Sequence, residues 1–344
     1  MSEWTKKDRF DAILTGELAD RPMVSGWRHF IDKEQTADDL AETTVAFTKK
    51  FDWDWVKINP RAAYLAEIWG NTYDFQEYRS VFPKQTSTVV PAASRVWDIQ
   101  EKKAAHSAPL AEQLQAVKQI REGLPDTPLI QTIFSPLSIL LFLTGQSAYF
   151  NSETIFGIEK PVQIETLITE QRAGVHHALH AIALTLADYI TELRSAGTDG
   201  IFYAVTGTAH PGLFDEATFN EFSRPYDSIV LDAARYGKRV LHTCGPYAHP
   251  ERFNDYEIEG ISWDTKAVGN HDLDASLKAT KIGGVDHTLF ATNEISRIQE
   301  QAESALKVMA DKPFSLAPNC SIPVNVTDEA LLQFKNSIVE KETM

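Results

Sequence analysis

Short apolar segments recur along the chain, and most of them are followed by a polar turn and then by a longer segment with helical periodicity. Several of these runs are nearly continuous rather than alternating, which is the pattern of parallel strands that are buried on both faces. Eight such runs are present: Pro22–Trp27, Asp54–Asn59, Pro128–Phe134, Gly200–Val205, Arg239–Gly245, Gly260–Thr265, Lys281–Asp286 and Pro313–Asn319.

Helical patterns separate most of these runs. They cover Asp38–Phe51, Pro161–Ala196 with Gly197 as its stop, and Phe214–Tyr236 with Asp215 as its N-cap. Eight strands that alternate with helices predict an α/β fold, a (β/α)8 TIM barrel. The alternative is a doubly wound sheet, but no glycine-rich phosphate loop follows the first run.

The segment Asn71–Gly123 does not fit a simple βα unit. It contains Arg95-Val96-Trp97-Asp98 and then a charged helical pattern from Leu110 to Arg121. We expect residues 1–344 to form a single barrel domain, in which residues 71–123 are an insertion after the second strand, near the barrel mouth.

Amino-acid composition and net charge exclude some classes of binding partner. With 43% hydrophobic residues the chain can bury a large core, and its formal net charge is −15. Nucleic acids and anionic membranes are therefore not expected as partners. The N-terminus lacks an apolar signal core and no run of 18 apolar residues occurs, so a cytoplasmic protein without a membrane span is expected.

The two cysteines carry the strongest chemical signal. Cys244 lies in Val240-Leu241-His242-Thr243-Cys244-Gly245, and Cys320 follows Ala317-Pro318-Asn319. Residues two apart on a strand point to the same side, and active sites of barrels lie where the strands end. His242, Cys244 and Cys320 would then form an N,S,S set, which is typical of a catalytic zinc with an open position that binds and activates a thiol. The alternatives are two unrelated core cysteines or a disulfide.

The chain also resembles a known family, the uroporphyrinogen decarboxylase superfamily, which includes the zinc-dependent methylcobamide:coenzyme M methyltransferases. The resemblance extends over nearly the whole chain and implies a (β/α)8 barrel. Its anchors are Arg21-Pro22, Ser135-Pro136-Leu137-Ser138-Ile139-Leu140, Phe219–Tyr226, His242-Thr243-Cys244-Gly245, Gly283-Gly284-Val285-Asp286 and Ala317-Pro318-Asn319-Cys320.

Departures from the decarboxylase pattern separate the two branches. That branch has an aspartate after strand 2, where this chain has Ile58-Asn59-Pro60-Arg61. Only Arg28 stands where two arginines are expected after strand 1, and Phe142 replaces a tyrosine. The resemblance to the methyltransferase branch implies zinc on His242, Cys244 and Cys320. Cobalt-independent methionine synthase is similar in its zinc barrel, where an acidic ligand follows the His-x-Cys pair on the next strand.

Further candidates lie near other strand ends. Asp264 is placed like that acidic ligand and would be a fourth ligand or a partner of His242, unless it is a helix N-cap. Asp286 would orient a ligand or substrate, or be a turn acid. Tyr203 would bond substrate, or fill a barrel layer. His210 could reach the mouth, and Arg28 would anchor a carboxylate or phosphate, or form a structural ion pair.

Three histidines on the long helix, His176, His177 and His180, include an i,i+4 pair. No glutamate of an H-E-x-x-H motif accompanies them, and the helix is expected outside the barrel, so structural or surface roles are favoured.

These observations predict a zinc-dependent methyltransferase that acts on a small-molecule thiol. A methylated corrinoid would be the donor, and a separate corrinoid protein would present it, because the barrel has no corrinoid domain of its own. The alternatives are a decarboxylase of a carboxylate-rich tetrapyrrole without zinc, and a barrel that binds a ligand without turnover.

Overall fold

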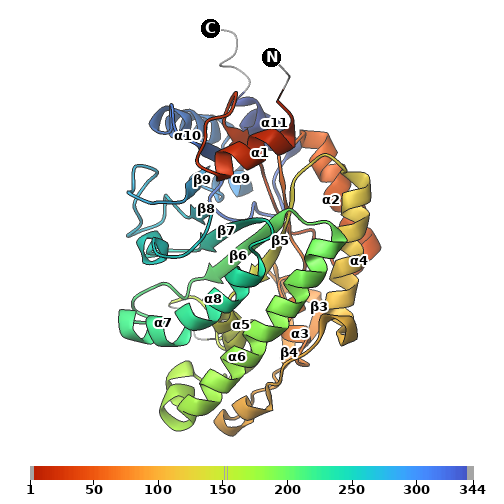
Figure 1. Ribbon diagram of the computed structural model, residues 1–344, viewed down its shortest axis with the longest axis vertical. Helices are drawn as coiled ribbons and strands as arrows, with labels where there is room; N and C mark the ends of the chain where they lie inside the picture. Colours follow the sequence, from red (N-terminus) through yellow and green to blue (C-terminus); the bar gives the residue numbers. More distant parts are fainter. Residues whose placement is uncertain (1–3, 151, 153, 339–344) are drawn as a thin grey trace.

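Eight parallel strands form one curled sheet in the computed structural model, which describes residues 4–150, 152 and 154–338 (Figure 1). Their order in the sheet is β1-β10-β9-β8-β7-β6-β5-β2. The strands are β1 (Met23–Val24), β2 (Val56–Ile58), β5 (Leu129–Phe134), β6 (Gly200–Thr206), β7 (Lys238–Thr243), β8 (Gly260–Trp263), β9 (Thr280–Val285) and β10 (Phe314–Pro318). Each of the eight strands lies within or overlaps one of the apolar runs, so the predicted strand count and fold class are confirmed.

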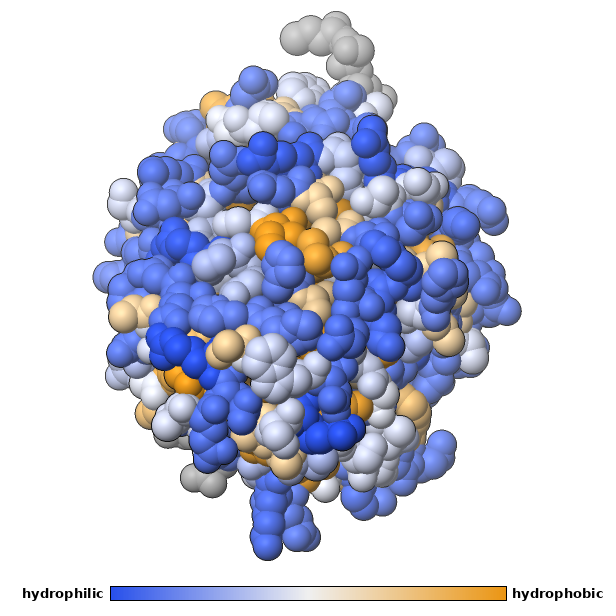
Figure 2. All heavy atoms as spheres, turned by 60° about the horizontal axis from the view of Figure 1, so that its bottom comes forward, coloured by the Kyte–Doolittle hydropathy of each residue, from blue (hydrophilic) through white to orange (hydrophobic). Residues whose placement is uncertain are grey.

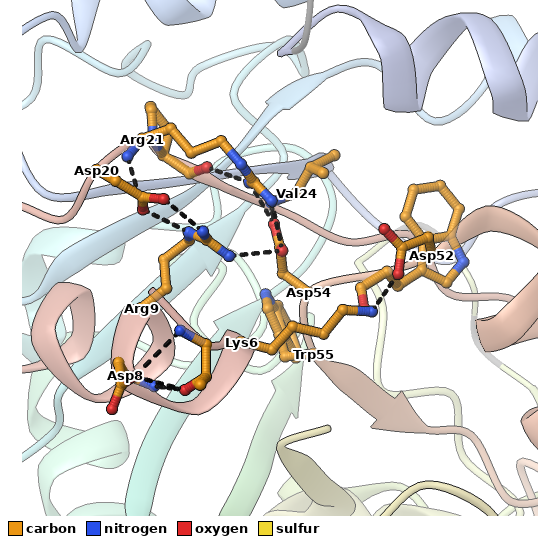
Figure 3. Close-up of polar contacts among 12 residues, drawn as sticks. Lys6, Asp8, Arg9, Asp20, Arg21, Val24, Asp52, Asp54 and Trp55 are labelled. Atoms are coloured by element: carbon orange, nitrogen blue, oxygen red, sulfur yellow. Dashed lines mark hydrogen bonds and ion pairs between the residues drawn. The ribbon is translucent and has the colours of Figure 1, made fainter. Parts of the chain in front are cut away.

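The two ends of the sheet meet at a buried aspartate. The N–H of Asp54, just before β2, donates to the Val24 carbonyl of β1 at 3.0 Å. The Asp54 carboxylate accepts from the N–H of Val24 at 2.7 Å and from Arg21 at 2.7 and 2.8 Å (Figure 3). Arg9 of helix α1 (Lys6–Leu14) lies 3.3 Å from the same carboxylate and also binds Asp20 at 2.6 Å. This network ties β1 to β2 and closes the barrel at its N-terminal end.

Helices surround the sheet. They are α1 (Lys6–Leu14), α2 (Ala37–Phe51), α3 (Tyr64–Glu67), α4 (Ala108–Gly123), α5 (Pro136–Thr144), α6 (Ile164–Ala196), α7 (Glu216–Phe222), α8 (Arg224–Ala233), α9 (Leu289–Thr292), α10 (Ile295–Val308) and α11 (Asp328–Asn336). Short 3-10 helices are η1 (Ala93–Asp98), η2 (Ala104–His106) and η3 (Pro250–Phe253). Helix α4 packs between α2 and α6 (Figure 1).

Local sequence sets the helix ends. Gly197, in a left-handed conformation with φ 104°, caps α6 as expected. Asp215 caps α7 by accepting from the N–H of Thr218 at 2.8 Å. The single helix expected over Phe214–Tyr236 is wrong, because the chain breaks at Ser223 into α7 and α8. Pro225 at the start of α8 has no N–H to continue the hydrogen bonding of α7.

Among the described residues the core has two main parts, and a third, small cluster of Ala37, Leu40 and Ala116 lies between α2 and α4. The larger cluster lies between the sheet and the helices and includes Ile58, Leu140, Leu186 and Leu241. The smaller of the two main clusters fills the barrel interior, and Phe10, Ile13 and Leu14 of α1 close it at the N-terminal end of the barrel. Its interior members are Met23, Trp27, Trp55, Ile130, Phe202, Val240, Ile282 and Ala317.

The segment 71–123 contains an antiparallel hairpin, β3 (Thr72–Arg79) and β4 (Phe82–Ser87), then η1, η2 and α4. In Figure 1 the hairpin lies toward the bottom, opposite α1 and the termini at the top. The face turned forward in Figure 2 is mostly hydrophilic with small, separate hydrophobic patches. Among the described residues, no helix combines the length and apolar character needed to cross a membrane.

Candidate metal centre

His242, Cys244 and Cys320 come together at the C-terminal ends of β7 and β10. Their ligand atoms all lie within 4.8 Å of one another, so the group can hold a metal ion. The two Sγ atoms are 3.4 Å apart. Cys244 follows β7 directly, and its N–H donates to the Thr206 carbonyl at the end of β6, which fixes the turn that carries the thiol. The site therefore combines the ends of two strands that are separated by β8 and β9 in the sheet and are distant in sequence.

Strand register decides how His242 is held. His242 of β7 is paired with Ser262 of β8, so both side chains point into the barrel. The Nδ1 atom of His242 lies 3.1 Å from the Ser262 hydroxyl. A hydrogen bond at Nδ1 leaves Nε2 as the atom for a metal and fixes the ring orientation.

The thiols affect each other strongly. The pKa of Cys320 is lowered because the Cys244 thiol hydrogen-bonds to it, and His242 contributes to the same effect. The pKa of Cys244 is raised by the hydrogen bond to Cys320 and by burial, because a second thiolate 3.4 Å from the first would be repelled. The Cys320 thiol therefore loses its proton more readily than the Cys244 thiol, and a cation would stabilise both thiolates.

A cavity of about 110 Å³ opens onto the thiols. Its apolar wall includes Trp27, Phe134 and Phe202 from the barrel and Val81 and Phe82 from the β3–β4 hairpin. It is smaller than the pockets that take drug-sized ligands, so it suits a small molecule. A larger groove of about 380 Å³ lies near α1 at the other end of the barrel, and none of the predicted site residues lines it.

Lys57 also lines the cavity, although it was not among the site residues predicted from the sequence. It lies in the middle of β2 and points inward, whereas Val56 and Ile58 belong to the outer core. Burial lowers the pKa of Lys57 to about 7, while the nearby Cys320 and Cys244 act in the opposite direction. The sequence feature that could have indicated Lys57 is its position between Val56 and Ile58, because a lysine is uncommon within an apolar strand.

Asp264 lies next to the cluster rather than in it. Its carboxylate accepts from Asn319 at 3.4 Å and from the N–H of Lys266 at 3.3 Å, and its Oδ2 is 4.0 Å from Nδ1 of His287. Burial raises the pKa of Asp264. The hydrogen-bond partner of His242 is Ser262 and not Asp264, because Ser262 is the residue in register with it.

Tyr203 does not reach the cavity. On β6, Ala204 is in register with His242 and Tyr203 with Leu241, so Tyr203 points to the helices. Its hydroxyl donates to the buried Asp227 of α8. The expected contact with substrate is therefore not present, because neighbouring residues on a strand face opposite sides.

The remaining candidates lie outside the cavity wall. Asp286 accepts from the N–H and hydroxyl of Thr288, the turn role that was the alternative. Arg28 donates to the Val324 carbonyl at 2.7 Å. His210 stacks on Phe150 with ring centroids 4.1 Å apart.

His176 on the long helix and Phe142 have structural contacts away from the proposed ligands. His176 of α6 is held by Tyr226 at 2.7 Å and Glu221 at 3.0 Å, on the outside of the barrel. Phe142 packs edge-on against Phe134, with centroids 5.6 Å apart. Within the part of the chain that the structure describes, neither residue hydrogen-bonds to His242, Cys244 or Cys320.

Fold and cluster together define a (β/α)8-type barrel whose mouth carries a histidine and two cysteines placed to hold a metal. The family model for uroporphyrinogen decarboxylase (URO-D) matches residues 18–340. The chain belongs to this family.

Solved structures show the same fold. A methyltransferase from Methanosarcina mazei superposes with a TM-score of 0.73 over 99% of this chain and 100% of that one, at 19% identity. A B12-independent methionine synthase from Shewanella sp. W3-18-1 superposes with a TM-score of 0.55 over 89% and 88% of the two chains, at 14% identity. Among curated proteins, no sequence matches significantly.

Proposed function

We propose that this protein is a zinc-dependent methyltransferase that methylates a small thiol. The main support for this proposal is the cluster of His242, Cys244 and Cys320, whose potential ligand atoms lie within 4.8 Å of one another at the barrel mouth. The site opens on a small apolar cavity, and its three protein donors leave a fourth position for substrate.

The donor set fits zinc. Zinc prefers thiolate and imidazole ligands in tetrahedral geometry. With Zn–S bonds of about 2.3 Å, two sulfurs of a tetrahedral site lie about 3.8 Å apart. The Sγ atoms here are 3.4 Å apart, so they would need to separate by only a few tenths of an ångström. Ser262, in contact with Nδ1 of His242, would keep Nε2 directed to the metal.

When bound here, zinc supplies a Lewis acid that lowers the pKa of the acceptor thiol, so that it reacts as a thiolate. The chain supplies the surroundings. Trp27, Phe134, Phe202 and Phe82 exclude water from the acceptor sulfur, which strengthens the electrostatic interactions in the cavity. The sulfur forms a bond to the methyl carbon as the bond between carbon and its donor breaks, and the bonding electrons leave with the donor.

A methylated corrinoid, presented by a separate protein, is the proposed donor. The mouth offers a surface for such a partner, because exposed rings directly adjoin the cavity. Tyr149 lines the cavity and Phe150 beside it is 45% exposed. Tyr247, three residues after Cys244, is 42% exposed, and His210 packs between these two rings. A planar macrocycle could lie against this aromatic group with its methyl directed into the cavity.

Decarboxylation of a tetrapyrrole has less support. The residues after β2 are Asn59, Pro60 and Arg61, and Arg61 is engaged by Glu67 and Glu112. Its charge is therefore balanced within the protein rather than available to a substrate carboxylate. A cavity of about 110 Å³ is also small for a macrocycle with many carboxylates.

Metal analysis of the purified protein tests the proposal first. We expect about one zinc per chain, and less than about a tenth of that in Cys244→Ser and Cys320→Ser. His271→Ala is the matched control, because His271 has a side chain 72% exposed and should leave the zinc content unchanged. Equal zinc in all four proteins would refute the site.

Methyl transfer tests the reaction itself. The zinc-loaded protein should methylate 2-mercaptoethanol with free methylcobalamin, which is followed by the cobalamin spectrum and by mass spectrometry of the thioether. Bound zinc without transfer to any of a panel of small thiols would favour the ligand-binding barrel.

A further inference from the structure

Lys57 occupies an unusual place for a lysine. Its Nζ donates to Oδ1 of Asn59 and lies 4.6 Å from the centre of the Phe202 ring and 5.8 Å from that of Trp27. The residue is only 9% exposed. It lines the same small cavity as Cys244 and Cys320. The amine thus reaches the space in which the proposed substrate would lie.

The ammonium form of Lys57 has no carboxylate partner, and among the described residues the only nearby groups that raise its pKa are the thiols of Cys320 and Cys244. Within the described ranges, no carboxylate oxygen lies within 4.0 Å of Nζ, whereas buried lysines are almost always paired with an acid. Asn59 and two aromatic faces compensate only part of the lost hydration. Burial accordingly lowers the pKa of Lys57 to about 7. A methionine would fill the same space at lower cost, so packing alone does not explain the lysine.

The proposed reaction brings a further negative charge to Lys57, whereas the charges of the Cys244 and Cys320 thiolates would be balanced by the metal. A thiol that binds as a thiolate brings one negative charge into the cavity and must lose one proton there. We propose that Lys57 accepts the proton of the acceptor thiol and then balances the charge of the thiolate as an ammonium. The S–H bond breaks with its electrons on sulfur, and the lysine amine gains the proton. After methyl transfer the sulfur is a neutral thioether, and Lys57 returns its proton to solvent. This inference rests on the proposed function.

Two other titratable side chains in the cavity wall already have acidic partners within the protein. Nδ1 of His29 is 3.1 Å from the buried Glu34. Arg61 is paired with Glu67 and Glu112. Two tyrosines also line the cavity: the Tyr64 hydroxyl donates to the Thr132 carbonyl, and burial raises the pKa of Tyr149. The other titratable groups in the wall are the proposed metal ligands His242, Cys244 and Cys320. Of these groups, His29 is the rival proton acceptor.

Proton counting by calorimetry distinguishes the possibilities. Zinc-loaded protein is titrated with 2-mercaptoethanol at pH 6 and pH 8, in buffers of different ionisation enthalpy. With a pKa near 7, Lys57 is mostly ammonium at pH 6 and mostly amine at pH 8. We therefore expect the wild type to release about 0.9 proton per thiol at pH 6 and about 0.1 at pH 8.

Variants identify the acceptor. Lys57→Met and Lys57→Gln should release about one proton at both pH values, and His29→Gln should behave as the wild type. Two replacements are used so that a folding defect in one does not decide the result, and circular dichroism and zinc content are measured for both. Equal proton counts in wild type and both Lys57 variants at pH 8 would overturn the proposal, as would a changed count in His29→Gln alone. If the zinc-loaded wild type binds no thiol at all, the proposed function itself fails.

Discussion

Closure of the barrel at Asp54 makes a sharp prediction about stability. The carboxylate is fully buried and accepts from the N–H of Val24, from both ends of the Arg21 guanidinium and from Arg9 (Figure 3). Asp54→Asn keeps the shape but places an NH₂ group against these donors. The ion pairs are lost, and a donor faces a donor.

The loss in the free energy of unfolding caused by Asp54→Asn depends on the partners that Arg9 and Arg21 retain. Removing one partner of a buried ion pair costs about 3–5 kcal/mol. Arg9 keeps Asp20, and the Arg21 side chain is 20% exposed and can be partly hydrated, so the lower end applies. For 344 residues the entropy of unfolding is about 0.7 kcal/mol per degree, so about 3 kcal/mol lowers Tm by about 4 °C.

Differential scanning calorimetry at neutral pH, with zinc content checked for each sample, measures the effect. Asp52→Asn is the matched control: Asp52 also pairs with lysines, Lys6 and Lys335, but its side chain is 70% exposed. Such a pair contributes about 0–1 kcal/mol, which corresponds to a Tm change of at most about 1.5 °C. Equal shifts for the two variants would contradict the assignment of Asp54 as the residue that closes the barrel.

Two further predictions concern side chains inside and beside the barrel. Ser262→Ala should weaken zinc binding about 10–100-fold, because the imidazole ring of His242 loses the hydrogen bond that orients it. Competition with a chromophoric chelator measures the zinc affinity, and an unchanged affinity would show that Ser262 does not orient His242. Burial raises the pKa of Asp227 to about 6, above its ordinary value of 3.8, so its contribution to stability is complete below pH 4 and is lost as pH rises through 6. Relative to Asp227→Asn, the wild type should therefore lose about 2.4 kcal/mol between pH 4 and pH 7 in urea unfolding, and parallel pH profiles would exclude this linkage.

The sequence by itself determined the fold class, the family and the strand ends that carry His242 and Cys320. These follow from local information, because burial on both faces leaves apolar runs and helix stops leave glycine or proline. Barrel topology then places all strand ends at one mouth, so the three ligands could be proposed together before any distance was known.

Only the tertiary structure decided the partners of these residues. The register between β7 and β8 places Ser262, rather than Asp264, within hydrogen-bond distance of His242. The register between β6 and β7 directs the Tyr203 side chain toward the helices. A shift of one residue would reverse both results, and no local pattern fixes it. Lys57 enters the site because the curled sheet brings β2 around to face Cys244 and Cys320 across one cavity. Such proximity arises from closure of the whole sheet, so it is not encoded in any single segment of the chain.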